Sequence, residues 1–417
     1  MAVHPLFELV KNRALFEDLA RSYGTPLYLY VDEQLRSNLE TIDAALRSAI
    51  RDYHICYAIK ANSNPHLLSR MRYHLPSLGG DCSSPGELEA ARRAGITGSE
   101  CIFTGNYESA DDLQAALDAG AHINLDDITS LDRLARLGLP EEISFRLNPG
   151  FGRGTFAQIV TAGEKAKFGV PHRDLVTAYR RAYELGIRQF GLQCMTGSGN
   201  LDPDYFESLL GVILQHAREL ETALGIHLNY LSIGGGFGIP YRDDQEPLDF
   251  GNLFSRLGRI LGQSYRRSKD RPQLWIEPGK SIVGNTGILL TRVTGIKSGY
   301  RTYIGTDAGM ETLMRPALYN AYHRIYKVGE PEAEPVQVVD ITGRICENTD
   351  RLAVERPFPA VKEGDLLAIL DVGAYGYSMS HQFNTRPRPA EVLLVDQRPQ
   401  LIRRRETIDD IFRTTKL

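Results

Sequence analysis

The sequence predicts a (β/α)8 barrel followed by a C-terminal all-β domain, and three observations lead to this fold class. The chain has 417 residues, more than the roughly 150 residues of one ordinary domain. Its first two thirds alternate eight short apolar runs with stretches of helical periodicity, as the strands and helices of a barrel do. After Glu277 the apolar runs continue with few long helical stretches between them, which is typical of an all-β domain.

The predicted barrel strands are His54–Ile59, Leu78–Cys82, Cys101–Thr104, His122–Leu125, Ile143–Leu147, Phe190–Cys194, Tyr230–Ile233 and Leu274–Glu277. Helical stretches between them include Ser84–Ala94, Ala110–Ala119, Arg173–Leu185, Asp204–Leu224 and Asn252–Leu261. Pro85 stands where the first turn of a helix tolerates proline, directly after Ser84, which can cap the helix. An open doubly wound sheet is the alternative fold, since strand ends are defined only to within a few residues.

The predicted β-domain strands are Ile288–Ile296, Thr302–Gly305, Val336–Thr342, Leu366–Leu370, Glu391–Val395 and Leu401–Arg405. A further strand-like run, Thr25–Tyr30, precedes the barrel, so that it joins either the barrel rim or the β-domain. We therefore expect an N-terminal segment over residues 1–30, a barrel over 31–280 and a β-domain over 281–417.

The balance of charge excludes some classes of protein. With 48 Lys and Arg against 52 Asp and Glu, the net charge is −4, whereas a protein that coats nucleic acid needs a basic field. No run approaches the roughly 20 apolar residues that span a bilayer, and the first residues lack the apolar core of a signal peptide. We expect a cytoplasmic protein with no nucleic-acid or membrane partner.

Five cysteines occur in the chain, at positions 56, 82, 101, 194 and 346. None forms a CxxC pair or has a histidine at zinc-ligand spacing, so we expect no metal site. An odd number excludes a complete set of disulfides within one chain. Most of these thiols are therefore expected to be reduced and buried, with one of them a candidate for reactivity.

Side chains at the predicted strand ends suggest chemistry, because barrel enzymes act at the C-terminal ends of their strands. Lys60 closes the first strand, Asp81 lies in the end of the second, Gly234–Gly238 follow the seventh and Glu277 ends the eighth. Taken singly, these residues are explained by a solvated lysine and an ordinary tight turn. Together they match pyridoxal phosphate (PLP), which needs a Schiff-base lysine, a cradle of backbone N–H groups and an acid at its ring nitrogen.

Longer motifs make the chain resemble the fold-type III PLP-dependent decarboxylases, most closely the branch that acts on diaminopimelate, with an alanine racemase-like barrel. The resemblance runs nearly from end to end. It rests on YAIKANSN at 57–64, GGGFGIPY at 234–241, IEPGKSIVGNTG at 276–287, DAGMETLMRPALYNAYH at 307–323, CENTD at 346–350 and DVGAYGYSMSHQFNTRPRPAEVL at 371–393.

The resemblance implies a role for each matching residue. Lys60 would bind the cofactor covalently, and Cys346 would protonate the carbanion left by CO2; these are the two catalytic residues. The cofactor would be held by Lys60, Asp81, Ser198, Gly235, Gly236, Glu277, Gly279, Lys280 and Tyr375. The amino-acid substrate would be held by Lys280, Arg315, Tyr319, Glu347 and Tyr375. In this family Cys346 and Glu347 would enter the site from the other subunit of a homodimer.

Without the family, two of these residues are ambiguous. Arg315 and Tyr319 are four apart, so they face the same way if the stretch is one helical turn, and an arginine fork suits a carboxylate. A surface arginine that pairs with an acid is equally expected. For Cys346, a buried structural cysteine is the favoured interpretation on frequency alone.

The chain departs from the family pattern inside the expected site. Met195 stands where the family has a histidine stacked on the cofactor ring, and Gln193 replaces a second common histidine. Lys280 replaces an arginine that helps to hold a substrate carboxylate, keeping the charge but losing the bidentate fork. The third and milder departure is Gly343-Arg344, where Gly-Pro is more common.

The resemblance implies decarboxylation of meso-diaminopimelate to L-lysine. One alternative is a related decarboxylase of a specialised pathway that acts on another amino acid or on a carrier-bound one. A racemase would need a second proton-donating face, for which the sequence offers no extra acid. A non-catalytic homologue that binds a partner would be expected to have lost Lys60, Glu277 or Cys346, and all three are present.

Overall fold

The computed structural model describes residues 4–416, and the chain divides into two compact units. The barrel unit comprises Ser37–Ile239 and Pro247–Ile282. The β-rich unit comprises Met1–Arg36, Pro240–Glu246 and Val283–Leu417. The short segment Pro240–Glu246, which the sequence prediction placed within the barrel, thus clusters with the β-rich unit.

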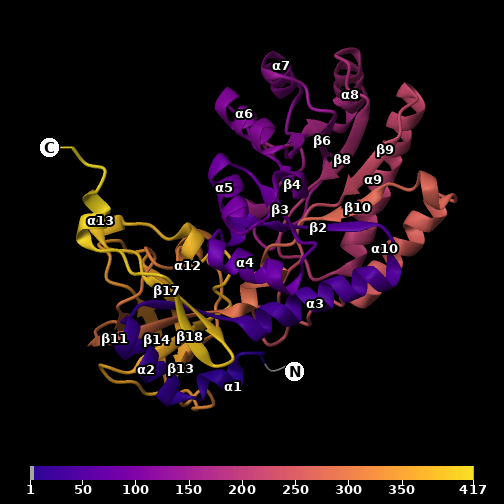
Figure 1. Ribbon diagram of the computed structural model, residues 1–417. Coiled ribbons are helices and arrows are strands. Elements are labelled where there is room, and N and C mark those ends of the chain that lie inside the picture. Colours follow the sequence, from indigo (N-terminus) through magenta and orange to yellow (C-terminus); the bar gives the residue numbers. More distant parts are fainter. Residues whose placement is uncertain (1–3, 417) are drawn as a thin grey trace. The chain divides into compact units, whose positions relative to one another are not determined.

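A closed sheet of eight parallel strands forms the barrel unit (Figure 1). Its strands are β2 (Tyr53–Ala58), β3 (Gly79–Cys82), β4 (Cys101–Phe103), β5 (His122–Leu125), β6 (Glu142–Asn148), β8 (Gln189–Cys194), β9 (Leu228–Ser232) and β10 (Gln273–Ile276). The sheet closes because β2 pairs with β10 as well as β3, and β5 pairs with β6. The barrel prediction is therefore confirmed over the open-sheet alternative. A two-residue strand, β7 (Val170–Pro171), adds to β6.

Helices surround the barrel strands, as Figure 1 shows. They are α3 (Asp32–Ala49), α4 (Pro65–His74), α5 (Pro85–Arg93), α6 (Ala110–Ala119), α7 (Ile128–Leu137), α8 (Leu175–Glu184), α9 (Pro203–Leu224) and α10 (Phe250–Ser264). Local sequence sets where they begin: Ser84 accepts a hydrogen bond from the Glu87 N–H at 3.3 Å, the predicted cap of α5. Each such cap satisfies a backbone donor that the first helical turn leaves free.

The β-rich unit contains β1 (Leu27–Val31), β11 (Gly287–Ser298), β12 (Thr302–Thr306), β13 (Ile325–Lys327), β14 (Gln337–Thr342), β15 (Arg351–Phe358), β16 (Leu366–Leu370), β17 (Ala390–Val395) and β18 (Arg398–Arg403). Strand β1 pairs with β11 and β17, so the early strand-like run joins this unit. The prediction missed β13, which is short, and β15, in which charges and Pro357 hide the pattern. Pro357 is tolerated because β15 is an edge strand.

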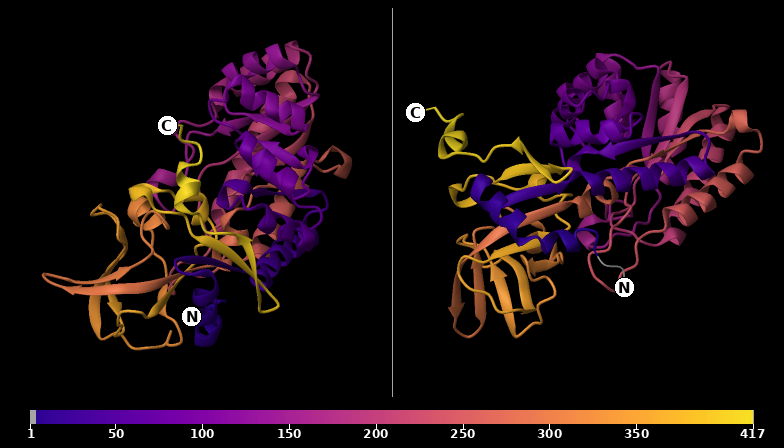
Figure 2. Two further views of the ribbon diagram at one scale, coloured as in Figure 1. Left: turned by 60° about the vertical axis from the view of Figure 1, so that its left-hand side comes forward. Right: turned by 60° about the horizontal axis from the view of Figure 1, so that its bottom comes forward.

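Short helices complete the β-rich unit: α1 (Phe7–Val10), α2 (Arg13–Tyr23), α12 (Arg315–Tyr319) and α13 (Ile408–Phe412). Apolar residues of α1 and α2 pack on the core that β1, β11, β16 and β17 form, and Figure 2 shows these helices beside the strands. A four-residue helix, α11 (Lys280–Val283), follows the barrel.

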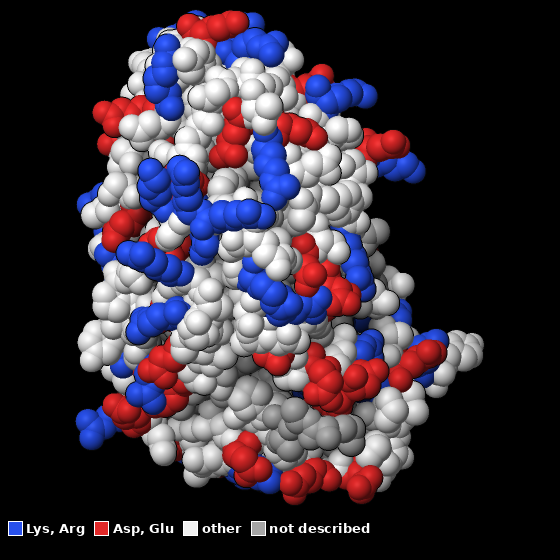
Figure 3. All heavy atoms as spheres, turned by 90° about the vertical axis from the view of Figure 1, so that its right-hand side faces the viewer, with Lys and Arg blue, Asp and Glu red and all other residues white. Residues whose placement is uncertain are grey.

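The surface carries charges of both signs. Basic and acidic side chains both occur over the face shown in Figure 3, in keeping with the net charge of −4. Within residues 4–416, no helix has the length and apolar character needed to cross a bilayer.

Candidate cofactor and substrate site

Lys60 lies just beyond the end of β2, in a single 3-10 turn over Ile59–Ala61. The strand ends at Ala58, one residue earlier than predicted. The Lys60 ammonium forms an ion pair with Asp81 at the end of β3, and this carboxylate is only 3% exposed while the lysine side chain is 42% exposed. Because Ala58 and Asp81 are register partners, the pair sits at the C-terminal end of two adjacent barrel strands.

Glu277 directly follows β10 and is buried. Its carboxylate accepts hydrogen bonds from the Ser232 hydroxyl at 2.6 Å and from the Gln193 amide at 3.0 and 3.2 Å. Burial, reinforced by the negative charge of Asp81, raises the pKa of Glu277 to about 7. No lysine, arginine or histidine within residues 4–416 forms an ion pair with it, so this carboxylate is suited to a cationic N–H group of a bound molecule.

The glycine run after β9 packs against the segment that contains Ser198. Gly236 has φ of +92°, a conformation that L side chains rarely adopt, and a Cβ there would lie 2.5 Å from the Gly197 carbonyl oxygen. The N–H groups of Gly199 and Asn200 both donate to the Gly236 carbonyl at 2.9 Å. Because these close approaches leave no room for side chains, backbone atoms line the turn.

The segment after Glu277 packs on the turn that carries Lys60. A Cβ on Gly279 would lie 3.0 Å from the Ala58 Cβ, and the Ala58 N–H donates to the Pro278 carbonyl at 3.1 Å. Lys280 is buried, with its ammonium 3.4 Å from the Ser198 hydroxyl. A Cβ on Gly235 would lie 2.3 Å from the Glu277 carbonyl oxygen. The structure thus brings together the predicted barrel residues Lys60, Asp81, Ser198, Gly235, Gly236, Glu277, Gly279 and Lys280.

These barrel residues fit PLP. A lysine on a short turn, a buried carboxylate that forms no ion pair within residues 4–416 and a glycine turn that a Cβ would fill are the three features that match the cofactor. Met195 lies at the mouth as well, because a Cβ on Gly234 would lie 3.0 Å from its sulfur.

Sequence reasoning missed Ser232 and Arg146, and it noted Gln193 only as the replacement of a family histidine. Ser232 and Gln193 orient Glu277, and their positions at the ends of β9 and β8 were the available signal. Arg146 on β6 is buried, lies 3.7 Å from Asp126, and has its pKa lowered by that burial. An arginine in the middle of an apolar predicted strand was the signal for it.

The β-rich unit holds the remaining predicted residues. Arg315 and Tyr319 begin and end α12, which confirms that they share one helical turn. Arg315 is only 3% exposed, its guanidinium donates to His323 at 3.0 Å, and it lies 4.7 Å from the centre of the Tyr241 ring. Within residues 4–416 it forms no ion pair, so the alternative of a surface arginine paired with an acid is wrong. His323 is a further residue that sequence reasoning missed.

Cys346 and Glu347 are exposed on the loop between β14 and β15. The other four cysteines are buried, so the favoured interpretation of Cys346 as a buried structural cysteine is wrong. Asp350 holds the loop, because its carboxylate accepts from the Ile345 N–H at 2.7 Å and the Met310 N–H at 2.6 Å. Tyr375 is half-buried in a turn and has φ of +57°.

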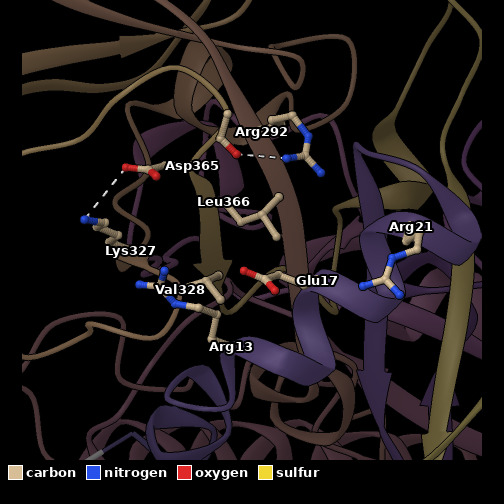
Figure 4. Close-up of a pocket in the computed structure, with 9 residues that line it drawn as sticks. Arg13, Glu17, Arg21, Arg292, Lys327, Val328, Asp365 and Leu366 are labelled. Atoms are coloured by element: carbon tan, nitrogen blue, oxygen red, sulfur yellow. Dashed lines mark hydrogen bonds and ion pairs between the residues drawn. The ribbon is translucent and has the colours of Figure 1, made fainter.

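A cavity of about 400 Å3 in the β-rich unit contains none of the predicted residues. Two of its charged side chains have partners that Figure 4 shows: Arg292 donates to the Gly364 carbonyl at 2.8 Å, and the Lys327 ammonium lies 3.7 Å from Asp365.

Comparison with known proteins shows the family. Residues 33–284 match the model of the pyridoxal-dependent decarboxylase, pyridoxal binding domain. Diaminopimelate decarboxylase of Methanothermobacter thermautotrophicus is 40% identical over 95% of this chain and 92% of its own. Protein TabA of Pseudomonas amygdali pv. tabaci is 36% identical over 95% and 92%.

Solved structures agree with this assignment. Diaminopimelate decarboxylase from Helicobacter pylori complexed with L-lysine has a TM-score of 0.85 and 32% identity, over 95% of this chain and 98% of its own. The enzyme from M. jannaschii has a TM-score of 0.88 and 31% identity, over 96% and 94%. The chain therefore belongs to the pyridoxal-dependent decarboxylases and is a PLP-dependent carboxy-lyase of the group that contains the diaminopimelate decarboxylases.

Proposed function

We propose that this enzyme decarboxylates meso-diaminopimelate to L-lysine. The observation that carries the proposal is Arg315, a buried guanidinium with no carboxylate partner in residues 4–416. A buried charge of this kind is costly unless a partner compensates it. The second carboxylate of diaminopimelate is such a partner, and relatives that are 37–40% identical bear the name of this activity.

We propose that the cofactor is held by Lys60, Asp81, Ser198, Gly235, Gly236, Glu277, Gly279, Lys280 and Tyr375. When bound, PLP would supply the aldehyde that takes the substrate amine and a ring that accepts the electron pair that stays on the substrate carbon when CO2 leaves. Asp81 holds the Lys60 ammonium at the barrel mouth. Ser232 and Gln193 orient Glu277, so that its carboxylate can accept a hydrogen bond from a protonated nitrogen.

The substrate's far end carries both a carboxylate and an ammonium group, so it calls for charges of both signs. Arg315 and Lys280 are the cations that we assign to carboxylate binding, with Tyr319 beside Arg315 on α12. Glu347 supplies the carboxylate for the ammonium group, and Tyr375 lines the site.

We assign to the Cys346 thiol the protonation of the carbon that has lost CO2. Its exposure on a loop supports this role, because a proton donor must reach the substrate. We further propose a homodimer in which Cys346 and Glu347 complete the site of the other subunit. The exposed Val338 and Val354 on adjacent strands of the same sheet are consistent with a covered surface there.

A second candidate is a decarboxylase of a specialised pathway that acts on a different amino acid. Met195 and Lys280, which depart from the family pattern, favour it. So does the identity of 36% to protein TabA, which does not bear the decarboxylase name.

Turnover by the purified holoenzyme tests the proposal. CO2 release is measured with meso-diaminopimelate and with a panel of amino acids that lack a second carboxylate. Arg315→Lys keeps the charge and Arg315→Met removes it, so KM for diaminopimelate is expected to rise modestly in the first and by about tenfold to a hundredfold in the second. A wild type that is inert on diaminopimelate and active on another amino acid would establish the second candidate instead.

A further inference from the structure

The hydrogen bonds of His323 fix its protonation state. A guanidinium only donates and a carbonyl only accepts, and His323 lies between one of each. Arg315 Nη1 donates to His323 Nε2 at 3.0 Å, and His323 Nδ1 lies 2.8 Å from the Leu370 carbonyl oxygen. The imidazole therefore carries its proton on Nδ1 and offers the Nε2 lone pair to Arg315.

Burial and the adjacent cation keep this imidazole neutral. His323 is 0% exposed, and burial together with the charge of Arg315 lowers its pKa to about 3. The Tyr241 ring packs against both partners, with its centre 4.7 Å from the guanidinium carbon and 5.6 Å from the His323 ring. The guanidinium is thus held from two sides by neutral groups.

This arrangement differs from the usual way of holding an arginine. A carboxylate would orient the guanidinium but would also neutralise it, leaving little attraction for an anionic ligand. A neutral acceptor orients it through one N–H and leaves the full positive charge. Within residues 4–416, Arg315 forms no ion pair, so its charge remains for a ligand.

We propose that His323 is a positioning residue for substrate recognition, which holds Arg315 in one orientation while leaving its positive charge for the substrate carboxylate. The inference rests on the proposed function of Arg315 and deepens it. It explains how a buried cation is fixed without an acid, and it assigns a task to a histidine that the chemistry of the cofactor does not use.

Steady-state kinetics of the holoenzyme on meso-diaminopimelate provide the first test. His323→Phe keeps the ring and removes the acceptor, so KM is expected to rise about tenfold with kcat within about twofold, the pattern of lost uniform binding. His323→Gln supplies an amide oxygen in place of Nε2 and is expected to restore KM to within about threefold. His216→Gln, a replacement of a mostly buried histidine that pairs with Glu219 on α9, is the matched control and should leave KM unchanged.

A double-mutant comparison separates positioning from general structure. In an Arg315→Met background, His323→Phe should raise KM no further, because the group through which it acts is gone. Equal KM values for His323→Phe and His323→Gln would overturn the proposal. So would a rise in KM from His323→Phe that is as large in the Arg315→Met background as in the wild type.

Nitrogen NMR of the imidazole groups gives a readout that needs no turnover. In 15N-histidine-labelled holoenzyme, the signal lost in His323→Phe is expected to show the neutral Nδ1–H form between pH 6 and 8, with Nε2 shifted by Arg315→Met. A protonated ring, or an Nε2–H form, would overturn the inference. If the wild type is inert on diaminopimelate while these shifts are as expected, the substrate assignment fails and the positioning of Arg315 stands.

Discussion

Glu277 is expected to destabilise the protein without its cofactor at alkaline pH. Its pKa rises from an ordinary 4.5 in the unfolded chain to about 7 in the folded protein, mainly through burial. Between these values the folded state binds more protons than the unfolded state, so the free energy of unfolding falls as pH rises through this window. At about 1.36 kcal/mol for each unit between the two pKa values, the loss above pH 7 is about 3 kcal/mol.

Replacement of this carboxylate by an amide removes the effect. Glu277→Gln apoprotein is expected to gain up to about 3 kcal/mol over the wild type at pH 8, and almost nothing at pH 4.5. Thermal unfolding monitored by circular dichroism at half-unit pH steps measures the difference. With saturating PLP the order should reverse, because the variant has no carboxylate for the ring nitrogen and binds the cofactor more weakly.

An exposed glutamate provides the control. Glu219 on α9 is half exposed, and hydrogen bonds from Gln215 and His216 lower its pKa. The variant Glu219→Gln is therefore expected to lose a little stability above pH 5, whereas Glu277→Gln is expected to gain stability. The reasoning would be refuted if the Glu277→Gln apoprotein were less stable than the wild type at pH 8. It would also be refuted if the difference in unfolding free energy between the two were constant from pH 5 to 8.

Four other outcomes are expected. Iodoacetamide should label one thiol per native chain, and Cys346→Ala should abolish the labelling and lower kcat by about a hundredfold. Mixing Lys60→Ala with Cys346→Ala should restore about a quarter of wild-type activity, since half of the exchanged dimers would hold one intact site; no recovery after proven exchange would exclude shared sites. If diaminopimelate is the substrate, Lys280→Arg combined with Met195→His should leave kcat/KM within about threefold, and a large gain would favour the specialised-pathway enzyme. Asp350→Asn should lower kcat by about tenfold through loosening of the Cys346 loop, and unchanged kcat and labelling rate would contradict that role.

The barrel could be predicted from the sequence because its strands are continuous apolar runs. The predicted strand His122–Leu125 coincides with β5, and the others differ by a few residues at their ends. Lys60 and Glu277 were found because each directly follows such a run. Strand β15 was missed because its exposed edge position permits charges and Pro357, which interrupt the pattern.

The partners of the site residues could not be predicted in the same way. Ser232 lies 45 residues from Glu277 in the chain, and Gln193 lies 84 residues away. Only the closure of the barrel brings them together. His323 is eight residues from Arg315, but a histidine outside a strand pattern gives no sign of what it contacts. Sequence thus located Lys60, Glu277 and Arg315, whereas tertiary structure identifies the neutral groups that orient Glu277 and Arg315.

The position of β1 between β11 and β17 has a consequence for biosynthesis. Leu27 of β1 pairs with Leu290 and Ala390, whereas the strands of the barrel all lie between residues 53 and 276. The barrel sheet is therefore synthesised in full before β1 meets its first partner strand. During that time the nascent chain carries an apolar strand with two unpaired edges close to its start, where pairing with other chains is a hazard. Chaperone contact with the emerging chain should therefore centre on residues 27–31 until β11 has left the ribosome.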